Sequence, residues 1–392
     1  MDPEFGDDEQ GRFQSITSPQ LISVMVLWLL TGSCMSAVGV FIAPIKSQYG
    51  LGDGQAAIIF AASTCGYLAA TATLGRIVAR GWRTMAEMVL LAALIGSTVL
   101  SFGPPFPIVL LGYAVLMFGL GMGDSGFNIW ASQTTRPHVV QGFMHSSFSL
   151  GSVLGPLLAA FLVRYGWSSF YRLMIFGQLA CGISFHYSFP KHTILSPSPD
   201  DDCTGRRVWH LPPVWVCSVF FLFYVGSEAI FTDWGPEYAR RAKGASSTSS
   251  SLASSLFWLG MAMGRLILGF VTQKVGARSV IWHLTAAACL QNLFRCEDLD
   301  VFYTTVFAIG FFLGPTFPSA ILVLTKAIPA HCTSNAVAIA VAVGQVGAAV
   351  TPLSLGFLSD RVGLAHLPDV SSTYSILVIG LWLILLSRQQ GS

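Results

Sequence analysis

Long apolar runs alternate with short polar segments along almost the whole of the 392-residue chain. Each run approaches or exceeds the roughly 20 residues that a helix needs to cross a bilayer. The first six runs cover residues 21–45, 56–78, 85–101, 107–131, 142–162 and 170–189, and six more cover residues 214–233, 252–271, 279–294, 301–324, 336–358 and 372–386. The pattern predicts an all-α membrane protein with twelve transmembrane helices in two six-helix repeats.

The polar segments divide these runs into domains. We expect a cytoplasmic tail at residues 1–20, an N-terminal six-helix bundle at 21–189, a cytoplasmic linker at 190–213 and a C-terminal six-helix bundle at 214–387. The ninth run, 279–294, is the weakest of the twelve, because it is short and carries His283, Gln291 and Asn292. If it does not span, every later segment changes sides.

Composition supports the membrane assignment and excludes several functions. Hydrophobic residues make up 53% of the chain and charged residues only 10%, against about 25% charged in soluble domains. The net charge of +2 indicates no nucleic-acid partner. The chain has no phosphate-binding loop, no metal-ligand spacing and no Ser, His and Asp set outside its helices. We therefore expect no enzyme activity, no cofactor, no metal and no ATP-driven pump.

The distribution of Lys and Arg predicts the orientation in the membrane, because cytoplasmic connections carry more of them. With both termini inside the cell, twelve of these residues lie in inner segments and eight in outer segments. We expect an integral, multi-pass, monomeric protein of the plasma membrane with both termini cytoplasmic.

Two of the acids within apolar runs are candidates for a function. Asp124 lies in the fourth run and is followed four residues later by Asn128, so that both share one helix face, and Glu228 lies deep in the seventh run. An ionisable residue inside a bilayer is costly, and by default it marks a pathway or a binding site. Burial disfavours the charged form of a carboxyl group, so both acids are candidates for proton binding. The alternative is a structural hydrogen bond between helices.

Five further side chains are candidates for contact with a solute: Asn128, His145, Ser149, Trp234 and Gln345. The amides offer donors and acceptors, and a tryptophan face can stack on a sugar ring. Asn128 and Gln345 could equally join helices, His145 could lie at an interface, and Trp234 could be an interfacial anchor. We expect Arg265 to extend its side chain to the inner membrane surface.

The two sets of six runs repeat each other. Small residues expected at helix contacts recur near one offset: Gly119 and Gly123 match Gly310 and Gly314 at 191, while Gly151 and Pro156 match Gly347 and Pro352 at 196. Halves related in this way pack about an axis along the membrane normal, with the solute site at the midplane between them.

This plan resembles the major facilitator superfamily over nearly the whole chain. The loop signature of that family, G-x-L-x-D-x-x-G-R, is altered between the second and third runs, where it lacks the acid, and between the eighth and ninth, where Gln273 replaces the acid. Residues 356–363 fit the signature well, but they follow the eleventh run and should lie outside the cell. The resemblance therefore implies a modified cytoplasmic gate.

Local runs are most similar to the fucose and glucose permease branch and its fungal relatives. These are the glycine-rich segment around Asp124, residues 145–156, residues 224–234 and residues 310–318. The resemblance implies a secondary active transporter that takes up a sugar or similar small polar solute with protons by alternating access, with Asp124 and Glu228 as the proton-coupling acids.

Two other hypotheses stay open. One is a proton antiporter that exports a small fungal secondary metabolite, and the other is a membrane sensor that does not transport. A cavity lined by amides and hydroxyls favours the sugar, a cavity lined by Phe and Met favours export, and a site without access from either side favours the sensor.

Overall fold

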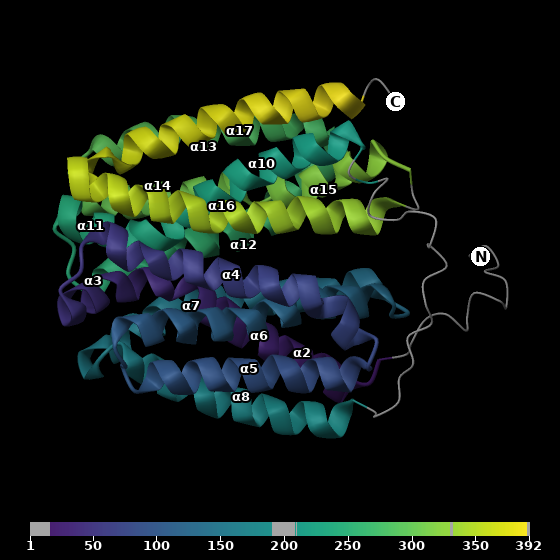
Figure 1. Ribbon diagram of the computed structural model, residues 1–392. Coiled ribbons are helices and arrows are strands. Elements are labelled where there is room, and N and C mark those ends of the chain that lie inside the picture. Colours follow the sequence, from purple (N-terminus) through teal and green to yellow (C-terminus); the bar gives the residue numbers. More distant parts are fainter. Residues whose placement is uncertain (1–15, 190–207, 209, 330–331, 390–392) are drawn as a thin grey trace, which may run out of the picture.

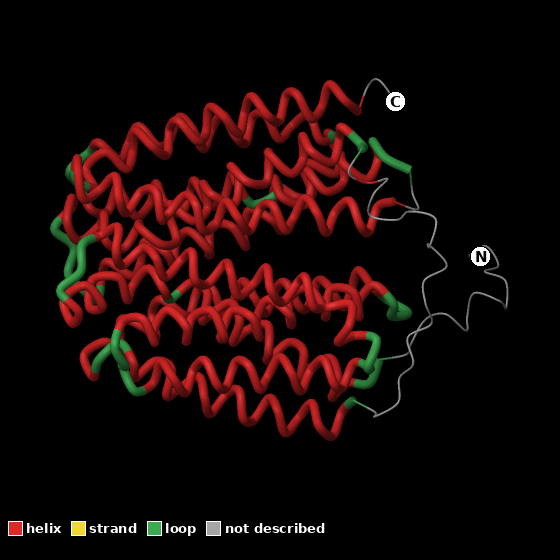
Figure 2. The backbone as a smooth tube through the Cα atoms, viewed as in Figure 1, coloured by secondary structure: helices red, strands yellow, loops and turns green. Residues whose placement is uncertain are grey.

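The computed structural model of the protein describes residues 16–189, 208, 210–329 and 332–389. These residues form helices joined by short loops (Figure 2). The first half contains α2 (Ser18–Ser36), α3 (Val38–Tyr49), α4 (Asp53–Val78), α5 (Trp82–Ser101), α6 (Phe106–Ser132), α7 (Pro137–Leu162) and α8 (Ser168–Ser188). The predicted tail, 1–20, and linker, 190–213, fall largely outside the described residues.

The second half follows the same order. It contains α10 (Pro212–Ala229), the π-helical turn η2 (Ile230–Trp234), α11 (Gly235–Lys243), α12 (Leu252–Val275), α13 (Val280–Leu290), the 3-10 helix η5 (Gln291–Arg295), α14 (Leu299–Leu313), α15 (Thr316–Lys326), α16 (Thr333–Val362) and α17 (Leu367–Gln389). Each half thus makes six passes within the described chain, because α2 and α3, α10 to α11, α13 and η5, and α14 and α15 each form one pass.

Ten of these passes are long and apolar enough to cross a membrane, among the residues that the structure describes. The other two are α8 and the ninth pass. The ninth run forms α13 and continues into η5, and the Gln291 amide donates a hydrogen bond of 2.7 Å to Ser375 Oγ of α17. Gln291, one of the three polar residues that weakened the sequence prediction, is therefore paired through its N–H group inside the C-terminal half, while its Oε1 atom has no partner among the described residues.

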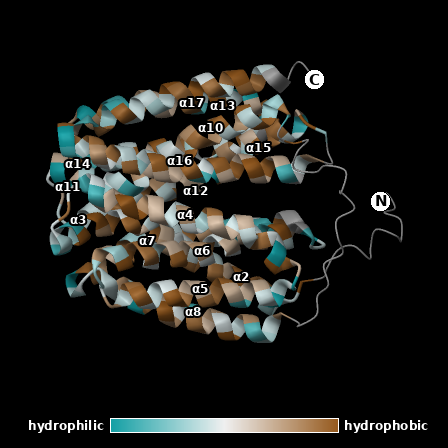
Figure 3. Ribbon diagram, in the orientation of Figure 1, coloured by the Kyte–Doolittle hydropathy of each residue, from teal (hydrophilic) through white to brown (hydrophobic). Residues whose placement is uncertain are grey.

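The two halves lie side by side (Figure 1). The helix α2 begins and α17 ends at the same face of the bundle, which we call the terminal face; the other end is the opposite face (Figure 1). Hydrophilic residues gather at these two ends (Figure 3). Large apolar side chains such as Leu111, Phe176, Leu266 and Ile376 are exposed along the sides, as expected for a surface that contacts lipid.

Glycines set the closest helix contacts within each half. A Cβ atom at Gly151 would collide with the backbone carbonyl of Leu29, and one at Gly347 would collide with the equivalent carbonyl of Leu222. In both cases the fifth helix of a half packs on the first. Pro156 and Pro352 lie inside the same two helices, α7 and α16.

In the fourth and tenth passes, the glycines that make equivalent contacts are not the ones that the sequence repeat paired. Gly314 lies against the α12 backbone at Met261, Gly264 and Arg265, and its counterpart by contact is Gly121, which lies against Tyr67 of α4. Gly119 instead packs on α5 at Val89 and Ala93, Gly123 lies near Val89 and Leu27, and Gly310 packs on α12 at Phe257. The helix contacts show the repeat, but they align the fourth and tenth passes at an offset other than 191. The sequence alone could not choose this alignment, because several neighbouring glycines could be matched.

A Gly347→Ala substitution should lower the melting temperature. The added methyl group meets backbone of α10, which cannot rotate away, and overpacking of this kind costs about 1–3 kcal/mol. The matched control is Gly269→Ala in α12, where nothing lies within 4 Å of the added atom. The control should be neutral or slightly stabilising, because alanine favours a helix over glycine. Equal melting temperatures for the two variants in detergent would contradict this packing.

Contacts between the halves run from the opposite face to the middle of the bundle. Phe357 of α16 covers Gly54 of α4 near the opposite face, and the Thr64 hydroxyl approaches the Gln345 carbonyl to 3.5 Å further in. The halves also meet between α7 and α12, where the Ser255 hydroxyl of α12 donates to the Val153 carbonyl of α7 over 2.9 Å. Helices of the two halves diverge towards the terminal face (Figure 1). This conformation is closed at the opposite face.

Candidate functional site

Asp124 is held by two neighbours. The Tyr67 hydroxyl of α4 donates to Asp124 Oδ2 over 2.6 Å, and the Asn128 amide donates to the Asp124 backbone carbonyl over 2.9 Å. Gly121 lies against the Tyr67 ring, and a Cβ atom there would collide with it. The glycine therefore lets α4 approach α6 closely enough for the tyrosine to reach the acid.

A small cavity of about 80 Å³ lies between the halves. Its polar lining residues are Ser63, Thr64, Tyr67, Asp233 and Gln345, and its apolar ones are Met35, Val38, Phe60, Met117 and Ala348. Residues from both halves contribute, as expected for a central solute site. Asp124 is not among the described residues that line this cavity. Its carboxylate accepts a hydrogen bond from Tyr67, which does line it.

Glu228 occupies the last turn of α10, directly before the π-helical turn η2. Its Oε1 atom is buried and has no hydrogen-bond partner within the described part of the chain. Tyr224, one turn earlier, lies beside the carboxyl group, and the Arg265 guanidinium of α12 is close enough to act on it electrostatically. An acid with one unsatisfied buried oxygen is costly, and π turns are frequent at functional sites.

Arg265 does not simply extend to the membrane surface, contrary to the expectation from sequence. The residue is half-buried, and its Nε atom is buried without a hydrogen-bond partner among the described residues. Its charge also reaches the His145 ring of the N-terminal half. Arg265 therefore lies near a residue of the other half as well as near Glu228. Sequence alone could not show this, because an arginine ten residues before a helix end can reach either water or a buried acid.

The other candidates for solute contact differ in whether their side chains already have partners within the protein. The exposed His145 ring packs edge-on against Trp28 of α2, with ring centroids 4.8 Å apart. The Ser149 hydroxyl donates back to the His145 carbonyl over 2.9 Å. Trp234 is fully buried, and its Nε1 donates to the Pro352 carbonyl over 3.0 Å, so the ring has no open face here. The structure thus brings Gln345 to the cavity and His145 near Arg265, whereas Ser149 and Trp234 face protein.

Sequence reasoning missed Asp233. This acid is buried in the π-helical turn and lines the central cavity. Gly39 of α3 packs directly against its backbone, so the two halves meet at this residue. The available signal was a second acid in the same apolar run as Glu228, five residues later.

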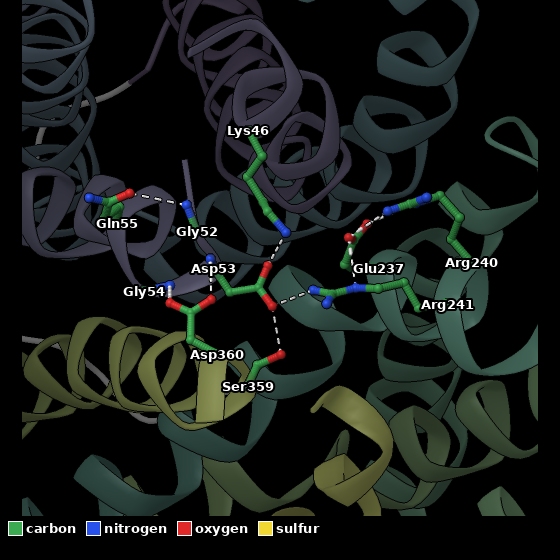
Figure 4. Close-up of polar contacts among 10 residues, drawn as sticks. All are labelled: Lys46, Gly52, Asp53, Gly54, Gln55, Glu237, Arg240, Arg241, Ser359 and Asp360. Atoms are coloured by element: carbon green, nitrogen blue, oxygen red, sulfur yellow. Dashed lines mark hydrogen bonds and ion pairs between the residues drawn. The ribbon is translucent and has the colours of Figure 1, made fainter. Parts of the chain in front are cut away.

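A cluster of charged residues joins the halves at the opposite face, and we call it the latch. Figure 4 shows its members: Lys46, Asp53, Glu237, Arg240, Arg241, Ser359 and Asp360. Asp53, only 2% exposed, pairs with Lys46, with Arg241 at 2.5 Å and with the Ser359 hydroxyl at 2.6 Å. Arg241 also pairs with Glu237 at 2.9 Å. The latch therefore connects α3 and α4 to α11 and α16.

Asp360 explains why the loop signature after the eleventh run is intact. Its two carboxylate oxygens accept hydrogen bonds from the backbone N–H groups of Asp53 at 2.7 Å and Gly54 at 2.8 Å. These groups lie at the N-terminus of α4, where N–H donors lack partners within the helix and a negative charge is favoured. The acid of the signature caps a helix of the other half, at the face opposite to the terminal one.

Comparisons with known proteins agree with this fold. A family model described as the Major Facilitator Superfamily matches residues 24–352 and 216–390. The chain is 24% identical to Bypass of stop codon protein 6 of Saccharomyces cerevisiae over 89% of this chain and 78% of that protein. It is 21% identical to the cis,cis-muconate transport protein of Acinetobacter baylyi over 63% and 65% of the respective chains.

A solved structure with the same fold is that of a D-xylose-proton symporter. It superposes with a TM-score of 0.70 at 11% sequence identity, and the match covers 93% of this chain and 96% of that chain. At this level of identity the likeness concerns the fold.

Proposed function

Since the chain belongs to the major facilitator superfamily and is a secondary transporter, we propose that it couples proton movement to the transport of a small polar solute by alternating access. The observation that carries this proposal is the environment of Glu228. Its carboxyl group is buried within the C-terminal half, with one oxygen unpaired among the described residues, beside a tyrosine and an arginine. Such a group gains or loses a proton when its surroundings change.

Tyr224 and Arg265 suit the two protonation states of Glu228. The Tyr224 hydroxyl donates to the Leu313 carbonyl over 3.0 Å, so its oxygen can accept a hydrogen bond from a protonated Glu228. An ionised Glu228 has no proton to donate, and the Arg265 guanidinium balances its charge instead. When Glu228 loses its proton, its partner therefore changes from Tyr224 of α10 to Arg265 of α12.

Opening and closing of the latch would switch access to the central cavity between the two faces. Solute could reach the central cavity from the opposite face only if Asp53 releases Arg241 and Asp360 releases the start of α4. We propose that the terminal face is cytoplasmic, as the excess of Lys and Arg in its connections suggests, and that the protein acts as a monomer in the plasma membrane. The conformation described here is then inward-facing.

The cavity lining favours a solute with polar and apolar sides. Hydroxyl and amide groups of Ser63, Thr64 and Gln345 suit a sugar, which is the first candidate. Met35, Phe60 and Met117 form an apolar wall, and this observation favours the second candidate, a proton antiporter that exports a small metabolite. The cis,cis-muconate transport protein, by its name, carries a small organic acid, so acidic solutes belong in any screen.

A screen in proteoliposomes tests the proposal. Radiolabelled sugars, small organic acids and lipophilic metabolites are offered with and without a proton gradient. We expect one class to accumulate only with the gradient, and we expect Asp124→Asn to reduce that accumulation at least about tenfold, because the Tyr67 hydroxyl loses its charged partner. Asp300→Asn, at an exposed acid of α14, is the control and should match the wild type. Transport of a solute at the same rate and level with or without a gradient would contradict the coupling.

A further inference from the structure

A second cavity, much larger than the central one, opens within the C-terminal half near the terminal face. Its volume is about 780 Å³, within the range of small-molecule sites. The described lining residues come from α12, the loop after it, α15 and the end of α17, and none of them belongs to the N-terminal half. This cavity shares no described lining residue with the central cavity between the halves.

The charge in this cavity has one sign. Arg265, Arg278 and Lys326 line it, and no acidic residue does so in the part of the chain that the structure describes. Among the described residues neither Arg278 nor Lys326 has an ion-pair partner, in contrast to Arg241, which pairs with Asp53, and Arg295, which pairs with Asp369. Three cations around one hollow attract anions.

Two buried polar atoms inside the cavity lack partners. Thr272 is 9% exposed, and its hydroxyl has no hydrogen-bond partner among the described residues; the same holds for the buried Nε atom of Arg265. Buried donors are nearly always paired, so these two point to a ligand with acceptor oxygens. Arginine is the residue of choice for pairing with phosphate.

The N-terminal half shows that the fold does not require this hollow. By the repeat, α6 and α8 correspond to the α14–α15 pass and to α17. At the terminal ends of α6 and α8, the rings of Phe127, Trp130, Phe185 and Phe189 pack against one another, with centroids 5.1–6.1 Å apart. In the C-terminal half the ends of α15 and α17 contribute Val323, Lys326 and Leu386 to the cavity instead.

We propose that this cavity binds a phosphate group, presented at the terminal face by an anionic lipid headgroup or by a soluble phosphate compound. Arg278 and Lys326 lie at the exposed rim and would hold the phosphate charge, while the Thr272 hydroxyl and Arg265 Nε would donate to its oxygens. The apolar side chains of Val275 and Leu322 are exposed beside the rim, where they can contact an acyl chain. Basic pockets between transmembrane helices are typical sites for anionic lipid headgroups.

Thermal unfolding of the full-length protein in neutral detergent tests the site. The additives are short-chain phosphatidylglycerol, phosphatidylcholine of the same chain length, and inorganic phosphate. Phosphatidylglycerol should raise the melting temperature by about 3 °C or more above phosphatidylcholine. A similar rise with inorganic phosphate identifies a soluble source, and a rise with phosphatidylglycerol alone identifies the lipid.

Variants separate the cavity from general surface charge. Arg278→Gln with Lys326→Gln should reduce the shift to the phosphatidylcholine level. The matched control is Lys274→Gln with Arg76→Gln, which removes the same charge from exposed positions near the same face outside the cavity lining. Thr272→Val should weaken the shift while the protein without additive melts at the wild-type temperature. No selective shift in the wild type, or an equal loss in both double variants, overturns the proposal.

Discussion

Replacing Glu228 with glutamine abolishes accumulation of the solute against its gradient, while exchange of solute across the membrane without net proton movement continues. Glutamine keeps the size and hydrogen-bonding capacity of the protonated acid but cannot ionise. The site is then fixed in the state that pairs with Tyr224, and the Arg265 guanidinium never gains a charged partner on α10. Gradient-driven uptake should fall to the level of protein-free liposomes.

Two assays in the same proteoliposomes separate the steps. Uptake driven by a proton gradient reports coupling, and counterflow of labelled against unlabelled solute reports exchange alone. Glu87→Gln is the matched control, because Glu87 is half-exposed and pairs with Arg83 at 2.8 Å on the surface of α5. It should retain both activities. Normal gradient-driven accumulation by Glu228→Gln would remove Glu228 from the coupling mechanism.

Replacing Asp53 with asparagine opens the opposite face. Asp53 is the buried acid of the latch, and its loss leaves Lys46 and Arg241 without their shared partner. Removing one member of a buried ion pair costs about 3–5 kcal/mol. Because Arg241 is partly exposed, we expect the lower end of this range, which shifts the balance between the two conformations about a hundredfold.

Spin labels at the opposite face measure this shift. Gln55→Cys and Arg361→Cys place labels on exposed positions of α4 and α16, in a background without reactive native cysteines. The Asp53→Asn variant should add a longer component to the distance distribution. Asp369→Asn breaks a pair with Arg295, 2.6 Å apart, within the C-terminal half, and should leave the distribution unchanged. Identical distributions for wild type and Asp53→Asn would mean that the latch does not hold this face closed.

Most of the fold could be predicted from the sequence, because apolar runs of spanning length leave few alternatives in a bilayer. The ninth pass was hard to predict for a physical reason: Gln291 lowers its hydropathy, but the amide is paired with Ser375. The sequence could not set the register of the repeat between the fourth and tenth passes. Gly119, Gly121 and Gly123 are all available there, and only the contact with Tyr67 selects Gly121.

The candidate site was partly predictable. A buried acid is visible in the sequence; in the structure Glu228 is buried beside Tyr224 and Arg265, and Asp124 is joined to the cavity through Tyr67. The partners of such acids come from distant positions, and Arg265 could not be assigned before its neighbours were known. Trp234 resembles a stacking residue in the sequence, but its indole N–H is used by the Pro352 carbonyl. The contacts by which the latch joins the two halves are made between residues 188 to 307 positions apart.

Simultaneous measurement of proton and solute flux tests the coupling by Glu228 most directly. Proteoliposomes that enclose a pH-sensitive dye are mixed with the transported solute, and both fluxes are recorded for the wild type and for Glu228→Gln. We expect addition of solute to drive a proportional proton flux in the wild type and none in the variant. Solute movement without any proton flux in the wild type, or an unchanged proton flux in Glu228→Gln, would contradict it.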